Sequence, residues 1–595
     1  MDRTSWIAVI ICFILLLAYG PVVNHLYPPQ PRPAQPATAT LPPSAEPLPT
    51  PGNGTPAVPA PPASQPEIAS APGDFTPDLP PEQVAVLENS LFAVTLTTHG
   101  GAVKEVTLKQ HQAENGKPVV LNSASSQPLL NLSGWGGPGS LQAYTLESST
   151  PASATFTRVL RPGLSLSRTY TLGDNYQIRL SQTVFNTGTS PEALPAYDLH
   201  LGTAASVYFT PGERPYVGLS WFTQDRDYIK HKLPEFDGFR PLGIPFSSGK
   251  SILQSKEGVE LRWAAVKSQF FAVVVACEGF NASGVKGVRR ELPAFRPKNE
   301  PIPDGIEAAL AVPGVAVGPA SSYQQQFLVY AGPKEDHRLR PLPDQIDHVM
   351  EFGWMGPVSR PLLMFMNVVH NWTGNYGLSI ILLTIVVKGV LWWPQGAANR
   401  SMKRMAAVGP LMKEMQEKYK DDPKKLNEKM LDIYRDYGVN PVGGCLPMLI
   451  QLPVFLGFYY MLLSAIELRH AGFLWVADLS QPDTIWRLPI PGLEFPVNPM
   501  PLIMAATMYW SMQSTPQPAG VDNPAYKIMK FMPLIFLLFC YNFSSALSLY
   551  WTVQNLLSIV QIKVNNLTPA PTLEELKAEA QRKRKQRKAG PWNRT

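Results

Sequence analysis

Cysteine is scarce in this sequence, which has four among 595 residues. Cys12, Cys445 and Cys540 lie in apolar segments, and Cys277 stands alone in a long stretch of soluble character. This spacing excludes a disulfide framework and a CxxC metal pair. The histidines show no HExxH pattern, and the acidic residues show no spacing that singles out an acid/base pair. The sequence therefore indicates neither a metal site nor a catalytic pair.

A strong net charge is also missing, because 51 Lys and Arg residues face 45 Asp and Glu residues, a formal net charge of +6. Charge alone therefore gives no indication of nucleic acid, and no DNA partner is expected. The charges are unevenly placed, and no Asp or Glu falls in any of the long apolar segments. A cation inside such a segment thus has no counter-charge at the same depth.

The central apolar segment is Asn375–Pro394, which reads NYGLSIILLTIVVKGVLWWP. About 20 residues are enough for a helix that spans a bilayer, with Pro394 as its stop. Lys388 inside such a helix costs roughly 3 kcal/mol, so its ammonium needs water, a counter-charge or a ligand. Thr384 and Gln395 follow the same side of the helix. We interpret this side as the lining of a wet groove open to a passing polypeptide.

The N-terminus begins with an apolar run, Trp6–Tyr19, in residues 1–27. The run fits a cleaved signal peptide and an uncleaved membrane anchor equally well, and either one exports the chain beyond it. Residues 28–81 are rich in Pro, Ala, Thr and Ser and cannot bury a core, so an extended tether is expected.

Residues 82–333 change to short segments rich in Val, Thr, Leu and aromatics, separated by Gly, Asn and Pro. Gly100-Gly101 predicts a hairpin turn. The predicted strands include Phe92–Thr98, Val103–Leu108, Ser165–Leu172, Tyr176–Thr183, Phe270–Ala276 and Tyr323–Val329. The pattern is typical of an all-β sandwich. A structural or docking domain is favoured over a sugar- or peptide-binding face.

Two amphipathic regions flank the central apolar segment. Residues 334–374 form a linker and an interfacial helix that starts near Pro357. Residues 395–441 predict a charged helical hairpin with a break at Asp421–Pro423. Methionines at helical spacing either join its two helices or offer a surface to apolar partners.

Residues 442–562 predict four further spans, at 443–466, 500–512, 528–541 and 546–562. Residues 563–595 form a basic tail that fits ribosomal RNA or anionic lipid, or a solvated tail that fixes topology. The positive-inside rule then places both termini, the hairpin and the tail in the cytoplasm and the β domain outside.

Polar residues in these spans gather in the cytoplasmic half of the predicted bundle. Gln451 lies about two turns from the inner end of its helix. Ser548, Trp551, Asn555 and Ser558 are spaced three or four apart and make one stripe on the last helix, flanked by Gln554. A pore would need polar lining along its whole length. The arrangement favours a cavity that is closed outside, although Gln451 or Asn555 taken singly also fits ordinary interhelical hydrogen bonding.

Three segments carry a family resemblance: GNYGLSIILLTIVVKGVLWWP, NPVGGCLPMLIQLPVFLGFYYML and IMKFMPLIFLLFCYNFSSALSLYWTVQN. With the charged hairpin between the first two, the chain resembles the YidC-type membrane protein insertases of Gram-negative bacteria. The resemblance implies a polytopic helical bundle of five core spans, an uncleaved N-terminal anchor and a periplasmic β supersandwich. It also implies an inner-membrane protein that is not an enzyme and needs no cofactor.

The resemblance further implies a set of substrate-contacting residues. The groove cation of the family falls on Lys388, where an arginine is usual, and its contacting threonine falls on Thr384. Its contacting aromatic falls on Trp551, beside Tyr550, where a tyrosine is usual. With Gln451 and Asn555 these residues form our candidate site.

The implied function is insertion and chaperoning of nascent membrane proteins, alone or with the Sec translocon. The implied partners are client chains, the Sec translocon, ribosomes and the lipid bilayer. Two other functions stay open from the residues alone. A small-solute transporter would use Lys388 as an anchor but calls for inverted repeats, which the sequence does not show. A membrane-tethered sugar-binding protein would depend on the β domain.

Overall fold

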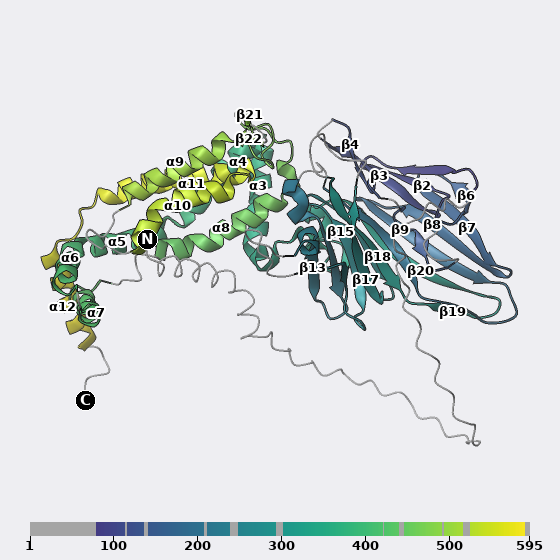
Figure 1. Cartoon of the computed structure of the whole chain (residues 1–595), viewed down its shortest axis with the longest axis horizontal. Coiled ribbons are helices and arrows are strands. Elements are labelled where there is room, and N and C mark those ends of the chain that lie inside the picture. Colours follow the sequence, from purple (N-terminus) through teal and green to yellow (C-terminus); the bar gives the residue numbers. More distant parts are fainter. Residues whose placement is uncertain are drawn as a thin grey trace, which may run out of the picture. The chain divides into compact units, whose positions relative to one another are not determined.

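The computed structural model describes residues 79–588 apart from 114–115, 126, 136–140, 207–210, 239–247, 293–301, 421, 440–445, 491–492 and 516–523. The predicted N-terminal anchor and most of the predicted tether lie outside the described residues. The described strands β1 to β20 fall between Val84 and Pro333, and all the longer helices follow them in the chain (Figure 1).

The largest sheet of the β domain has nine antiparallel strands. Their order is β13 (Tyr228–Lys232), β12 (Gly218–Thr223), β15 (Leu261–Lys267), β16 (Phe271–Glu278), β20 (Ser321–Pro333), β9 (Gln177–Asn186), β8 (Leu164–Leu172), β7 (Ser153–Arg161) and β6 (Thr145–Ser149). The predicted strands at 165–172, 176–183, 270–276 and 323–329 are thus neighbours or near neighbours in one sheet.

Smaller sheets complete the domain. A five-stranded sheet has the order β14 (Ile252–Gln254), β17 (Gly284–Glu291), β18 (Asp304–Val312), β11 (Tyr197–Ala204) and β5 (Leu132–Ser133). A four-stranded sheet joins β1 (Val84–Glu88), β2 (Phe92–Thr97), β3 (Ala102–Gln112) and β4 (Pro118–Leu121), and β10 (Glu192–Leu194) pairs with β19 (Val315–Val317). Strand β11 packs on β15 and β16 of the large sheet, which gives the predicted sandwich-like arrangement.

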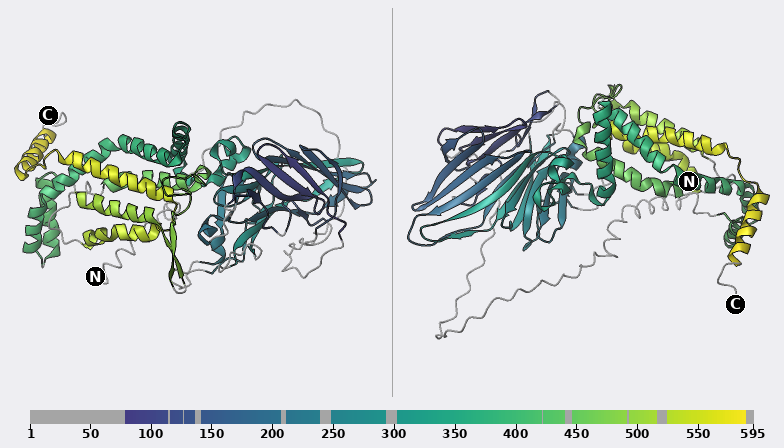
Figure 2. Two further views of the ribbon diagram at one scale, coloured as in Figure 1. Left: turned by 90° about the horizontal axis from the view of Figure 1, so that it is seen from above. Right: turned by 180° about the vertical axis from the view of Figure 1, so that it is seen from behind.

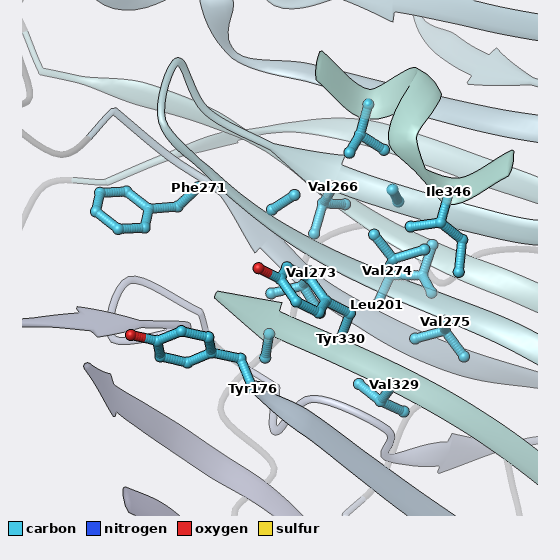
Figure 3. Packing of buried hydrophobic residues seen from close by; sticks show 14 of the residues in the cluster. Tyr176, Leu201, Val266, Phe271, Val273, Val274, Val275, Val329, Tyr330 and Ile346 are labelled. Carbon is cyan, nitrogen blue, oxygen red and sulfur yellow. The ribbon is translucent and has the colours of Figure 1, made fainter. Parts of the chain in front are cut away.

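The core of the domain is built from β-branched and aromatic side chains on both faces of the large sheet. Val266 and Val329 lie on one face and Val274 lies on the other, and all three are almost fully buried. Figure 3 shows these residues together with Ile346 of the short helix η5 (Pro343–Met350). Such residues pack well on a pleated surface, which explains why this stretch of the sequence forms strands.

The predicted Gly100-Gly101 turn joins β2 to β3, with φ of +90° and +53° at the two glycines. The buried Arg168 of β8 donates to the carbonyl oxygens of Gly100 (3.1 Å), Gly101 (3.0 Å) and Leu130 (2.6 Å). Burying a guanidinium costs free energy unless its donors find acceptors, and three backbone carbonyls accept from its two terminal nitrogens here. This contact ties the four-stranded sheet to the large one.

Strand β11 carries a half-buried histidine that makes folding depend on pH. His200 Nε2 lies 2.9 Å from Ser133 Oγ, while its buried Nδ1 has no partner among the described residues. Burial lowers the pKa of His200 to about 4, from about 6.5 in the unfolded chain. Between these values the unfolded chain binds the additional proton, so stability is complete above pH 6.5 and falls as the pH drops towards 4.

We therefore expect the unfolding temperature of the full chain in detergent to fall less steeply from pH 7 to pH 4 in His200→Asn than in the wild type. The histidine contributes up to about 3 kcal/mol, at 1.36 kcal/mol for each pKa unit. Unfolding temperature between pH 4 and 7 is the measurement, and His337→Asn at an exposed position is the control. Identical acid slopes in wild type and His200→Asn would contradict the assignment.

The first long helix after the β domain is α3 (Gly356–Thr373), with Pro357 in its first turn as predicted. Leu363 and Met366 are buried, while Met364 and Trp372 on other sides are 72% and 84% exposed. The helix is therefore amphipathic, and its location in the outer interface stays a prediction.

The central apolar segment forms α4 (Tyr376–Val390), which starts at Asn375, whose side chain accepts from Leu378 N at 3.1 Å. It is shorter than predicted, because the chain bends by 61° before α5 (Trp392–Ala407). The prediction that Pro394 ends the helix was wrong: Pro394 lies in the first turn of α5, where a proline displaces no intrahelical hydrogen bond.

Length and apolarity do not identify a bilayer span in any single helix of the described residues. The bent pair of α4 and α5 satisfies both criteria when the two helices are taken together.

Four more helices correspond to the other predicted spans: α8 (Leu446–Ser464), α9 (Pro499–Ser514), α10 (Pro524–Cys540) and α11 (Ser545–Asn566). Helix α11 packs along α9 and α4, and α3 packs on both α4 and α8 (Figure 2). Between α8 and α9 lies a two-stranded hairpin that the sequence patterns did not predict, β21 (Trp486–Ile490) with β22 (Leu493–Val497).

The charged hairpin consists of α5, α6 (Gly409–Lys418) and α7 (Pro423–Asp436), with the predicted break before Pro423. The basic tail adds a helix, α12 (Leu573–Lys588), which packs on α7. Leu576 is buried beside Val408 and Met412. Arg404 forms an ion pair with Glu579 at 3.0 Å. A freely solvated tail, one of the sequence-based alternatives, is therefore wrong for this part of it.

Candidate functional site

Lys388 is the centre of the candidate site and lies two residues before the end of α4. The side chain of this lysine is buried, with 3% of the residue exposed. Its Nζ donates to Gln395 Oε1 at 2.6 Å and to Ser558 Oγ at 2.9 Å. The ammonium is thus held between α4, α5 and α11.

A second layer of amides extends this contact to α8. Gln395 Nε2 and Gln554 Nε2 both donate to Gln451 Oε1, each at 3.0 Å. Gln451 Nε2 in turn donates to the Tyr550 hydroxyl at 3.2 Å. One hydrogen-bonded network, which we call the Lys388 network, therefore joins α4, α5, α8 and α11. Its members are Lys388, Gln395, Gln451, Tyr550, Gln554 and Ser558.

The bend after α4 is what places Gln395 in this network. Gln395 follows Lys388 by seven residues, and α5 starts at Trp392 after a turn of 61°. A second contact at the bend fixes α5 to α11, since Gln561 Nε2 donates to the carbonyl oxygen of Trp392 at 3.0 Å. The short connection therefore directs the Gln395 amide to the side of α4 that carries the lysine.

Both acceptors of the lysine are neutral. Within the part of the chain that the structure describes, no carboxylate forms an ion pair with Lys388. An ammonium has three donors, and hydrogen bonds to a charged acceptor are shorter and about twice as strong as those to a neutral one. A carboxylate acceptor would therefore bind this ammonium more strongly than either of its two neutral acceptors does.

The two candidate aromatics on α11 have different surroundings. Tyr550 is 2% exposed and stacks on Phe458 with ring centroids 4.1 Å apart. The Trp551 ring lies 4.4 Å from that of Phe455, 4.9 Å from that of Phe536 and 6.4 Å from that of its neighbour Tyr550. Tyr550 thus belongs to the network, and Trp551 belongs to an aromatic cluster between α8, α10 and α11.

Two other candidates are not joined to the lysine. Thr384 is 1% exposed, and its hydroxyl donates to the Ile380 carbonyl of its own helix at 2.6 Å. Asn555 points to α9, where its amide donates to Thr507 Oγ1 at 3.2 Å and to Met504 O at 3.4 Å. For Asn555, ordinary interhelical hydrogen bonding is therefore the observed role.

Three network residues, Gln395, Gln554 and Ser558, were not among the candidate site residues. Their signal was present in the sequence, because Tyr550, Gln554 and Ser558 are spaced i, i+4 and i+8 and share one helix face. That face overlaps the stripe of Trp551, Asn555 and Ser558, and the sequence alone does not show which one meets α8.

Comparison with known families covers both parts of the chain. The family model described as "60Kd inner membrane protein" matches residues 368–569, and the model described as "YidC periplasmic domain" matches residues 84–365. Together they include the Lys388 network and the whole sandwich. They define an inner-membrane protein with a large periplasmic domain.

Full-length relatives are also similar to the chain. A membrane protein insertase YidC of Geobacter sp. is 31% identical over 497 residues, which covers 81% of this chain and 85% of that protein. The YidC of Oleidesulfovibrio alaskensis is 30% identical and covers 94% of this chain and 98% of that protein. The chain belongs to the YidC family of membrane protein insertases, whose named role is not enzymatic.

Among solved structures, the active YidC insertase crystal structure with its first transmembrane domain resolved is similar to this chain, with a TM-score of 0.32 and 17% identity. The match covers 82% of this chain and 95% of the chain in the crystal structure.

Proposed function

We propose that the chain inserts membrane proteins into the bacterial inner membrane by receiving a polar segment of the client at the Lys388 network. The observation that carries this proposal is a buried ammonium whose acceptors among the described residues are a neutral amide and a neutral hydroxyl. A client carboxylate would replace Gln395 or Ser558 as acceptor and add a charge-assisted bond. The free-energy cost of moving a hydrophilic tail across the membrane then falls, because part of its path is polar.

The proposal includes a groove between α4, α8 and α11 that opens to the cytoplasm and the lipid. Hydrogen bonds join these helices through flexible side chains of Gln395, Gln451 and Gln554, so a client can displace contacts without unfolding a helix. Polar contacts of this kind in membranes contribute only about 0.6 kcal/mol each, which makes their exchange inexpensive.

We further propose that the chain has multiple passes, with both termini, the charged hairpin and α12 in the cytoplasm. The Sec translocon and the ribosome are proposed as partners, and chaperoning of clients as part of the activity. Support for the ribosome comes from the exposed basic side chains on α12 and α7, which one folded unit presents together. They include Arg582, Lys585, Lys425 and Lys429.

Reconstitution tests the proposal. The purified chain in liposomes should increase translocation of a short acidic client tail, read as protease protection, over empty liposomes. A photo-crosslinker at Ser558, whose hydroxyl accepts from Lys388, should capture the stalled client. A photo-crosslinker at Leu502, which is 46% exposed on α9, should not. Equal protection in empty liposomes would rule out insertion by this chain.

A further inference from the structure

The hairpin between α8 and α9 has one apolar face. The antiparallel register pairs Trp486 with Val497 and Leu488 with Phe495. Residues that lie opposite each other share a face, and successive residues alternate between faces. Arg487, Pro489 and Pro496 therefore belong to the other face.

This apolar face is uncovered among the described residues. Trp486 is 61% exposed, Phe495 is 42% exposed and Leu488 is 39% exposed. No further strand joins the hairpin in the described part of the chain. An isolated two-stranded hairpin is marginally stable in water, so an apolar face of this kind needs a cover.

The base of the hairpin is fixed to the ends of two helices. Tyr541, just after α10, donates from its hydroxyl to Pro496 O at 2.7 Å, and its ring lies 5.5 Å from that of Phe495. Its carbonyl accepts from Asn498 Nδ2 at 2.8 Å, directly before α9. Asp483 also accepts from Met500 N at 2.7 Å in the first turn of α9. These bonds hold the apolar face on the side of α10.

That side of the bundle is itself apolar and exposed. Leu538 and Phe539 at the end of α10 are 74% and 67% exposed, and Leu502 and Ile503 on the first turns of α9 are 46% and 37% exposed. In an inner-membrane protein, acyl chains cover such a surface. The hairpin face continues it past the helix ends, where tryptophan is favoured at the membrane boundary.

The length of α9 supports the same conclusion. Its 16 residues extend for about 24 Å, and the hydrocarbon core is about 30 Å thick. A helix this short leaves a mismatch at one end, which lipid or protein must fill. The apolar hairpin ends where α9 begins, so it extends the apolar surface along the membrane normal beyond the end of this helix.

We propose that β21 and β22 lie in the outer interface of the inner membrane, with Trp486, Leu488 and Phe495 against the acyl boundary of the outer leaflet. The inference rests on the proposed orientation of the bundle. The hairpin then fixes the outer ends of α9 and α10 at a defined depth, and α9 packs against α11, which carries three of the six members of the Lys388 network.

Environment-sensitive labels on the full chain in nanodiscs of phosphatidylethanolamine and phosphatidylglycerol test this. The four native cysteines are first replaced by serine. The fluorophore NBD is then placed at Leu488→Cys, at Arg487→Cys on the opposite face, and at Leu538→Cys on α10. Iodide is the aqueous quencher, and a lipid with a doxyl group near the headgroup is the membrane quencher. Trp486→Cys repeats the measurement if Leu488→Cys does not fold.

The label at position 488 should be quenched by the doxyl lipid and be at least threefold less accessible to iodide than the label at 487. Equal iodide access at 487 and 488, with lipid quenching at 538, would overturn the hairpin inference. The bundle would then lie in the membrane while the apolar face of the hairpin does not contact lipid and is free for a protein partner. Iodide access at 538 would instead contradict the membrane orientation, and hence the proposed function itself.

Discussion

Replacing Lys388 by glutamate is expected to reduce insertion of clients with acidic tails to about a tenth of the wild-type rate. A hydrogen bond to a charged group contributes about 1.5–3 kcal/mol, and 1.4 kcal/mol corresponds to a factor of ten. The substitution also leaves Gln395 Oε1 and the new carboxylate facing each other without a donor, and it repels an acidic guest. The measurement is the protease-protected fraction of a client tail in liposomes.

Lys388→Arg is the matched control, because it keeps the charge and provides more donors for the same acceptors. It should retain insertion of acidic tails. Clients with neutral tails provide the second comparison and should lose far less in Lys388→Glu. An equal loss for acidic and neutral tails would show that direct charge pairing is not how the site works, even if the chain is an insertase.

The lysine was found from the sequence because composition alone makes it exceptional. It is a cation in an apolar segment, and no span contains an acidic residue. That argument needs no knowledge of which residues contact Lys388 in the folded chain. The structure supplies what the argument left open, since the partners of Lys388 are the neutral groups of Gln395 and Ser558.

The stripe on the last helix shows where sequence reasoning ends. A helix turns by about 100° per residue, so the face of Tyr550, Gln554 and Ser558 lies well to one side of Asn555. Both faces are polar enough to suit a cavity. Only the placement of α8 and α9 decides that Gln451 meets Gln554 and that Thr507 meets Asn555. Periodicity does not contain that information.

The sequence predicted the strands of the β domain but did not predict the hairpin of β21 and β22. The sandwich strands are rich in valine and aromatics and are separated by turn residues, so their patterns predicted them. Strands β21 and β22 carry Pro489 and Pro496, which argue against a strand unless it lies at an edge. In a two-stranded hairpin each strand has a free edge, so a proline need not remove a ladder bond.

Close helix packing beside the site leads to the second large expected effect. Ser359 Oγ of α3 donates to the carbonyl oxygen of Gly457 in α8 at 2.9 Å. A Cβ at Gly457 would overlap the Val358 Cγ1 methyl group and lie 3.1 Å from Val358 Cβ. Small residues allow helices to approach closely in membranes. Because α3 also packs on α4, any separation here is transmitted to the helix that carries Lys388.

Gly457→Leu should therefore destabilise the chain by about 2 kcal/mol or more, since overpacking of a well-packed contact costs about 1–3 kcal/mol and the Ser359 bond is lost as well. The measurement is the fraction of monodisperse chain after heating in detergent. Leu452→Phe adds bulk to the same helix at an exposed position and should have little effect. Gly457→Ala combined with Val358→Ala should recover most of the stability, because the obstructing methyl groups are gone. Wild-type behaviour of Gly457→Leu would mean that α3 and α8 are not in close contact.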